Sequence, residues 1–376
     1  MTGTPRSSTH PPLPPTTEAD RFNRLRLLRS RRVGVATFHR LIAEHGSAEV
    51  ALEALPDVAR AAGVTDYAIC PEGVIHAELK AARAVKAWML CLGDPDYPAS
   101  LATLDDAPPI LWAVGDTSLL TRPMVALVGA RNASSLGTRM ARKLAADLSS
   151  AGYVVVSGLA RGVDAAAHHA AIEAGTVAVL GGGVDVIYPN ENAELFHVIG
   201  AKGLRLSEQP IGLQPQARHF PARNRIISGL SQAVVVVEAA AKSGSLITAE
   251  NALAQGREVF AVPGHPFDGR AGGCNALIRD GATLIRGAED VIAGLTPLAE
   301  DAPELPLAPI PQPQRSFEDS KALHKKILSR LGPSPIAEDQ LIRDMKLAPS
   351  LIAPALIALE LDGAIQRHVG GLLSRL

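Results

Sequence analysis

The sequence has 376 residues, which is enough for two or three domains. It carries 37 Lys+Arg against 38 Asp+Glu, and this net charge of −1 excludes a uniformly basic surface, so any anion-binding site must be local. Aromatic residues make up only 3%, which argues against a broad platform for base stacking, and no apolar stretch is long enough to predict a membrane span.

Three cysteines, Cys70, Cys91 and Cys274, lie far apart in the chain. Their spacing fits neither a zinc site nor a disulfide framework, so they indicate a reducing, cytoplasmic location. We expect no metal and no cofactor.

The first part of the chain predicts a tail followed by a small helical domain. Residues 1–18 are rich in Pro, Ser and Thr, which is typical of disorder. Residues 19–86 are rich in Leu, Ala and Arg at helical spacing, and Gly34 interrupts one apolar stripe. A helix–Gly–helix turn can contact a DNA backbone, but such turns are common in helical bundles, and packing or protein contact is the favoured interpretation.

Residues 87–295 predict a doubly wound α/β domain with a mostly parallel sheet. Short β-branched runs without polar alternation indicate strands that are buried on both faces. The expected strands are Val125–Val128, Val154–Val156, Val177–Leu180, Val234–Val237 and Val259–Val262. The expected helices between them include Thr138–Ser150, Val163–Ala174 and Leu246–Gln255.

The last part of the chain predicts a linker and a winged-helix-like module. Residues 296–316 hold six prolines and form the linker. Within residues 317–376, helical spacing covers His324–Leu331, Ile336–Met345 and Pro349–Asp362, and Ala364–Leu373 suits a short hairpin. Basic and acidic residues are nearly balanced in this module, which favours protein contact over duplex DNA binding, although the latter stays open.

Unusual residues follow the expected strands, where ligands bind in doubly wound sheets. Gly129 and Arg131 follow the first strand, and Gly158 and Gly162 flank Arg161 after the second. Free backbone N–H groups beside a helix start, together with arginine, favour an anion. The glycines alone are equally compatible with simple turn geometry. A triple glycine, 181–183, follows the third strand and is a weak indication by itself.

A basic segment over residues 218–225 is prominent in this otherwise neutral chain. Its members with binding chemistry are Arg218, Phe220, Arg223, Asn224 and Arg225. Arginines at a helix start oppose the helix dipole, so we expect an anion to compensate them. The alternative is internal salt bridges to Glu208 or Glu238.

Hydroxyl groups and a bare amide follow the fourth strand, at Ser243, Gly244, Ser245 and Thr248. This loop resembles a phosphate cup but lacks the P-loop spacing. We expect all these loops to meet at one sheet edge and to bind a polyanion or nucleotide. His168 and His169, with Asp164, suit a metal pair in principle, but histidines in an Ala-rich helix are more often structural.

Four segments closely resemble the bacterial DNA-processing protein family DprA, also called Smf. They are Val128–Arg131, Ser157–Asp164, Phe220–Ile227 and Ser243–Ala249, in the family's order. Asp94–Pro98 and Ala107–Pro109 resemble the entry to its central domain. The resemblance covers residues 20–295 well.

This resemblance implies a non-enzymatic protein that binds single-stranded DNA. The family protects DNA taken up in natural transformation and loads the recombinase RecA past single-strand binding protein for homologous recombination. It implies an extended Rossmann-like core that dimerises, a sterile-alpha-motif-like or helix-hairpin-helix N-terminal domain, and a C-terminal winged helix. By the same resemblance, the DNA-binding residues are Gly129, Arg131, Arg161, Gly162, Arg218, Phe220, Arg223, Asn224, Arg225, Ser243, Gly244, Ser245 and Thr248.

Two other interpretations stay open. The loops also resemble phosphoribohydrolases that activate cytokinins, in which Glu238 or Glu250 would act near the ribose. In the other interpretation, the protein is an interaction scaffold and its basic loops serve only to stabilise the fold.

Overall fold

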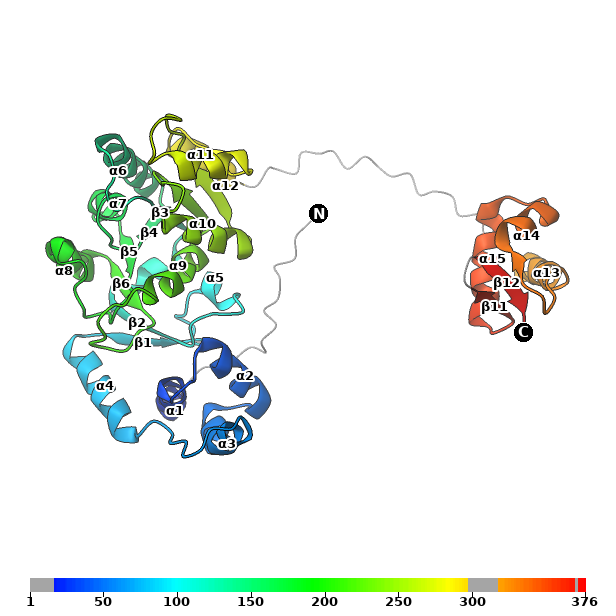
Figure 1. Cartoon of the computed structure of the whole chain (residues 1–376), viewed down its shortest axis with the longest axis horizontal. Coiled ribbons are helices and arrows are strands. Elements are labelled where there is room, and N and C mark those ends of the chain that lie inside the picture. The colour runs from blue at the N-terminus through cyan, green and yellow to red at the C-terminus, as the bar shows by residue number, and fades with distance from the viewer. Residues whose placement is uncertain (1–16, 297–316, 369–370) are drawn as a thin grey trace. The chain divides into compact units, whose positions relative to one another are not determined.

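The computed structural model describes residues 17–296, 317–368 and 371–376, in two units that divide after Pro297 (Figure 1). The predicted tail and linker lie almost entirely outside the described residues. The first helix begins at Glu18, one residue before the boundary expected from composition. No helix among the described residues is long and apolar enough to cross a membrane.

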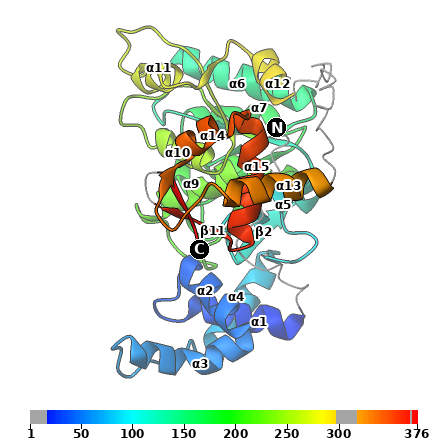
Figure 2. The same cartoon turned by 90° about the vertical axis from the view of Figure 1, so that its right-hand side faces the viewer.

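The helices of the N-terminal part pack on each other and on one end of the sheet (Figures 1 and 2). They are α1 (Glu18–Arg29), α2 (Val35–His45), α3 (Ala48–Ala61) and α4 (Glu72–Ala84). Phe38 and Leu41 belong to the apolar core that these helices share. Leu25 and Ile75 pack instead against Trp112 of the sheet. This second apolar cluster joins the helices to the sheet.

Nine strands of the first unit's described residues form one sheet in the order β1-β2-β6-β5-β4-β3-β7-β8-β9. They are β1 (Trp88–Cys91), β2 (Ile110–Gly115), β3 (Met124–Val128), β4 (Val154–Ser157), β5 (Thr176–Val179), β6 (Leu204–Ser207), β7 (Ala233–Val236), β8 (Glu258–Ala261) and β9 (Thr283–Leu284). β3 to β9 are parallel, whereas β1 and β2 pair antiparallel at one end. The five Val-rich runs are confirmed as β3, β4, β5, β7 and β8 within one residue at each end.

Helices cover both faces of the parallel part. One face carries α5 (Ala99–Ala102), α9 (His219–Leu230), α10 (Ser245–Ala254) and α11 (Gly272–Arg279). The other carries α6 (Ser135–Ser150), α7 (Val163–Ala171), α8 (Ala193–Lys202) and α12 (Ala288–Leu295). From β3 the chain proceeds outward to β6 and then returns to β7 on the other side of β3. The β3–β7 boundary is therefore the topological switch point, where ligands bind in open α/β sheets.

The second unit is a winged helix with its own core, which includes Ile327, Leu341, Leu356 and Leu373. Its elements are α13 (Phe317–Leu328), β10 (Ile336–Ala337), α14 (Glu338–Met345), α15 (Pro349–Leu361), β11 (Ile365–His368) and β12 (Leu372–Arg375). The helix predicted from Ile336 was wrong at its start, because Ile336 and Ala337 pair with β12. The predicted hairpin is present as β11 and β12, although residues 369–370 of its turn lie outside the described residues.

Candidate nucleic-acid interface

Two cavities adjoin at the carboxyl ends of the parallel strands. The larger, which we call the switch-point cavity, has a volume of about 650 Å³ and lies between the loops after β3 and β7. The smaller, which we call the Tyr188–Phe220 pocket, has a volume of about 290 Å³ and lies between the loops after β4 and β5. Arg131, Phe220 and Arg223 line both cavities, so these side chains form the wall between them.

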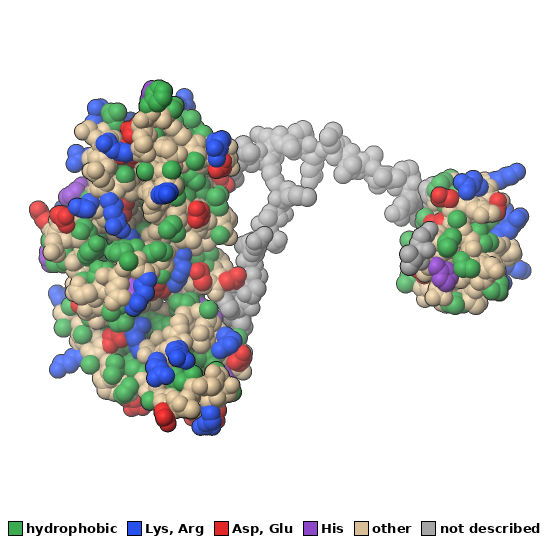
Figure 3. All heavy atoms as spheres, in the orientation of Figure 1, with side chains coloured by type: hydrophobic (Ala, Val, Ile, Leu, Met, Phe, Trp, Pro, Cys, Tyr) green, Lys and Arg blue, Asp and Glu red, His purple; other side chains and the backbone are tan. Residues whose placement is uncertain are grey.

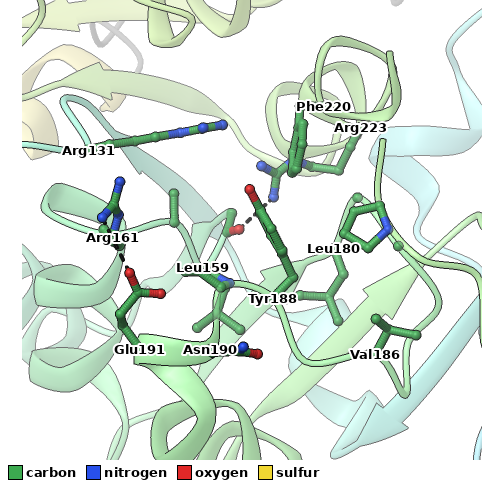
Figure 4. Close-up of a pocket in the computed structure, with 16 residues that line it drawn as sticks. Arg131, Leu159, Arg161, Leu180, Val186, Tyr188, Asn190, Glu191, Phe220 and Arg223 are labelled. Carbon is green, nitrogen blue, oxygen red and sulfur yellow. Dashed lines mark hydrogen bonds and ion pairs between the residues drawn. The ribbon is translucent and has the colours of Figure 1, made fainter. Parts of the chain in front are cut away.

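Arg131 and Phe220 combine a free cation with an aromatic face. The Arg131 guanidinium carbon lies 5.2 Å from the centre of the Phe220 ring, and the Tyr188 ring lies 5.5 Å from it on another side (Figure 4). A Cβ on Gly181 would come within 3.0 Å of the Phe220 ring, so glycine there lets the ring lie on the strand end. Among the described residues Arg131 has no hydrogen bond or ion pair, which leaves its charge available to an anion.

The glycines beside Arg131 and Arg161 let two loops pack against each other. Gly162 has φ +77°, and a Cβ there would collide with the carbonyl oxygen of Ala130. A Cβ on Gly129 would come within 2.7 Å of Val163. Close packing and turn geometry thus explain the glycines. The packed loops bring both Arg131 and Arg161 to the lining of the Tyr188–Phe220 pocket. Arg161 is exposed, and its Nη1 lies 3.3 Å from Glu191 Oε1.

Arg223 is buried, unlike the other two arginines. Its Nη1 donates to the carbonyl oxygen of Gly158 at 2.8 Å and to that of Val179. Burial lowers the pKa of Arg223 to about 10, so the side chain stays charged at neutral pH. Asp164 accepts hydrogen bonds from the backbone N–H groups of Gly158 (3.1 Å) and Ala160 (3.3 Å). Burial raises the pKa of Asp164, and the charge of Arg223 opposes that rise. Arg223 therefore ties the ends of β4 and β5 together.

Three predicted residues line neither cavity: Gly162, which packs against the loop after β3, and the two arginines Arg218 and Arg225. Arg225 forms an ion pair with Glu208 at 2.5 Å and another with Asp106 at 3.5 Å, and its side chain is only 13% exposed. The salt bridge to Glu208 was one of the alternatives that the sequence left open. Arg218 is exposed at the start of α9 and lines neither cavity.

The loop after β7 forms the polar floor of the switch-point cavity. The predicted residues that line this cavity are Ser243 and Gly244 of the loop, Ser245 and Thr248 at the start of α10, and Asn224 of α9. The hydroxyls of Ser243 and Ser245 are 2.8 Å apart. Two further cations line this cavity but were not selected from the sequence, Lys242 and Arg270.

On the face drawn in Figure 3, the cations of the first unit do not merge into one broad patch. On the face drawn in Figure 3, Lys and Arg side chains of the first unit lie in small groups among hydrophobic and neutral ones. This distribution agrees with the balanced charge of the sequence, in which any anion site has to be local.

The Glu238 carboxylate binds the N-terminus of α6. It accepts hydrogen bonds from Ser134 N at 3.0 Å and from Ser134 Oγ at 2.5 Å, at the start of α6. The helix N-terminus after the switch-point strand is where a nucleotide phosphate often binds, and here a carboxylate fills that position. Glu250 is exposed on α10. Neither glutamate lines the two cavities, so nothing in their placement favours the phosphoribohydrolase interpretation.

His168 is a structural side chain. It is fully buried, its Nδ1 lies 2.7 Å from Thr176 Oγ1, and burial lowers its pKa from 6.5 to about 3. The described residues contain no group of three or more potential metal ligands. His168 is therefore neutral in the folded protein.

The buried His168 makes stability depend on pH. The unfolded chain binds a proton at this residue below about pH 6.5, whereas the folded chain does so only near pH 3. Because the unfolded state binds more protons between these values, stability falls as the pH drops below 6.5, by up to about 1.4 kcal/mol per pH unit. We expect His168→Gln to lose less stability than the wild type between pH 7 and pH 5 in urea denaturation. His169→Gln, which changes an exposed neighbour, serves as the control, and an unchanged slope in His168→Gln would contradict the assignment.

Fold and site together define an extended Rossmann-like protein with a cation–aromatic wall at its switch point. A family model described as DNA recombination-mediator protein A matches residues 88–296. Models of a DprA-like N-terminal HHH domain and a DprA winged helix domain match residues 18–81 and 311–371. The chain belongs to this DprA/Smf family, as its four loop segments suggested.

Relatives support the assignment across most of the chain. "Protein Smf" of Synechocystis is 38% identical over 307 residues, which are 74% of this chain and 77% of the relative. The DNA processing protein DprA of Streptococcus pneumoniae is 48% identical over 202 residues, 53% of this chain and 71% of the relative. The solved structure of DprA from S. pneumoniae matches with a TM-score of 0.58 at 37% identity, over 73% of this chain and 92% of that one. DprA from Helicobacter pylori, whose structure concerns its single-stranded DNA binding mode, matches with a TM-score of 0.52 at 32% identity, over 56% of this chain and 95% of that one.

Proposed function

We propose that this chain binds single-stranded DNA across the switch-point cavity and the Tyr188–Phe220 pocket, and that its role there is binding and not catalysis. The observation that carries the proposal is Arg131, an exposed cation that lies over Phe220 between the two cavities and has no hydrogen bond or ion pair within the described part of the chain. Arginine pairs well with phosphate, and an aromatic face stacks on any base. The single-stranded DNA binding described for the H. pylori relative supports the same ligand.

The switch-point cavity suits the phosphates of the strand, and the Tyr188–Phe220 pocket suits its bases. The switch-point cavity is lined by the cations Arg131, Lys242 and Arg270 and by the hydroxyl-bearing Ser243 and Ser245, which suits the phosphates of an extended strand. In the pocket, Phe220 and Tyr188 offer ring faces. Phosphate contacts carry no sequence information, so this part of the binding is sequence-tolerant and weakens with salt.

We also propose a wider role as a homodimer that protects single strands and loads RecA in natural transformation and recombination, in competition with single-strand binding protein. Membership of the recombination-mediator family supports this role. One protomer offers few cations, so it binds a strand weakly, and a second protomer on the same strand adds effective concentration. A variant held as a monomer, with unchanged affinity for a long strand, would contradict the need for a dimer.

The first test is fluorescence anisotropy with labelled oligo-dT and a duplex of equal length, at low and moderate salt. We expect the single strand to bind more tightly and its affinity to fall as salt rises. No binding at low salt, or equal binding of the duplex, would overturn the proposal.

A further inference from the structure

The Tyr188–Phe220 pocket has room for a base. Its volume of about 290 Å³ corresponds to about ten water molecules at about 30 Å³ each. A nucleobase fits in that space. Figure 4 shows two unlike sides, with Tyr188 and Phe220 on one and Arg161 and Glu191 on the other, and Leu159 between them.

The aromatic side suits the flat face of any base. The two rings are 5.5 Å apart and inclined by 38°, and Tyr188 is 45% exposed. Stacking on such rings adds affinity but distinguishes little between bases, because every base has a π-face. Any base preference must therefore come from the opposite side.

The opposite side carries hydrogen-bonding groups that make few contacts with other described residues. Arg161 and Glu191 make one contact of 3.3 Å, and their side chains are 60% and 59% exposed. An exposed ion pair contributes little, so a ligand can open it at small loss. Asn192 Nδ2 donates to the carbonyl oxygen of Leu159 at 2.9 Å, which joins η2 (Asn190–Asn192) to the loop that carries Arg161. Oε2 of Glu191 has no partner among the described residues.

We propose that this pocket receives one base of the bound strand and prefers guanine, an inference that rests on the proposed function. An ionised carboxylate only accepts hydrogen bonds, and it can accept two at once. Among the four bases, only guanine offers two adjacent donors on its Watson–Crick edge, the ring N1–H and the 2-amino group. Glu191 accepts both, and Arg161 donates to the neighbouring carbonyl oxygen of guanine, so the existing ion pair is replaced by a matched set of contacts.

The other bases match this side less well. Thymine places a carbonyl oxygen on each side of its N–H, and both oxygens would face the carboxylate. Adenine and cytosine have one amino group beside a ring nitrogen that is itself an acceptor. For these three bases the pocket provides stacking with at most one hydrogen bond to Glu191.

The test compares full-length protein on single strands of equal length, with alternating dT-dG, alternating dT-dC and dT alone. Alternation avoids runs of guanine and lets a guanine reach the pocket in every second register. We expect dT-dG to bind about fivefold more tightly than the other two strands. In Glu191→Gln that preference disappears, since an amide presents one acceptor and one donor in place of two acceptors.

The matched control is Glu194→Gln, which removes the same charge from an exposed position on α8 near the pocket. Loss of negative charge strengthens the binding of all strands in both variants, so the ratio between strands is the readout. The preference persists in Glu194→Gln. Free dGMP and dTMP, added as competitors, distinguish a strand base from a free nucleotide.

The outcomes separate this inference from the proposed function. Equal binding of the three strands overturns the guanine preference and leaves single-strand binding intact. A preference that survives in Glu191→Gln overturns the assignment to that carboxylate. If dGMP displaces the strand at the strand's own concentration, the pocket takes a free guanine nucleotide and not a strand base. Absence of binding by every strand overturns both proposals.

Discussion

Replacing Arg131 with alanine is expected to weaken single-strand binding by tenfold to a hundredfold without unfolding the protein. The guanidinium is exposed and borders both cavities, and no residue that the structure describes forms a hydrogen bond or ion pair with it. A hydrogen bond to a charged group contributes about 1.5–3 kcal/mol, and each 1.4 kcal/mol is a factor of ten in affinity. The variant also loses the cation–π contact between the Arg131 guanidinium and the Phe220 ring.

The measurement is anisotropy with oligo-dT across a salt series. Besides the lower affinity, loss of one phosphate contact reduces the salt slope by about one. The control is Arg142→Ala, because Arg142 is an exposed cation of α6 that lines neither cavity and has no partner among the described residues. Equal affinities in the two variants would show that the strand does not pass the Arg131–Phe220 wall.

Composition and periodicity predicted the parallel core because its strands are buried on both faces. A run such as Val154–Val156 has no polar residue to obscure it, and its neighbours are Ala-rich helices. β6 was missed because Arg205 lies inside it. That arginine is buried and its guanidinium stacks on the Phe196 ring at 3.7 Å, an arrangement that no strand pattern predicts. β1 and β2 are apolar but pair antiparallel, outside the alternation of strand and helix on which the prediction relied.

The location of the site was predictable, whereas the state of each arginine was not. Glycine and arginine at several strand ends indicate one sheet edge, since the carboxyl ends of parallel strands meet there. Whether an arginine is available to a ligand depends on partners far away in the sequence. Glu208 binds Arg225, and the carbonyl oxygen of Gly158 binds Arg223, while Arg131 forms no hydrogen bond or ion pair with any described residue. Tyr188 was missed, although an aromatic residue in a strand-end loop is itself an indication in a chain with only 3% aromatics.

The buried position of Arg223 leads to the second large effect, a loss of stability. We expect Arg223→Ala to lower the free energy of unfolding by about 3–5 kcal/mol, because it leaves a buried charge without its counter-charge. Asp164 would remain buried beside an empty space, and the carbonyl oxygens of Gly158 and Val179 would lose their donor. Arg131→Ala, in contrast, should stay within about 0.5 kcal/mol of the wild type, as exposed substitutions usually do.

Urea denaturation followed by tryptophan fluorescence measures this in the whole chain. The sequence has two tryptophans, Trp88 and Trp112, and both lie in the first unit, so the signal follows the unit that contains Arg223. Arg223→Lys keeps a charge but lacks the planar fork of donors, and we expect it to recover only part of the loss. If Arg223→Ala unfolds at the wild-type urea concentration and yet binds oligo-dT poorly, then Arg223 contacts the strand directly. If it unfolds early, its weaker binding follows from the separation of the β4 and β5 loops that carry Arg161 and support Phe220.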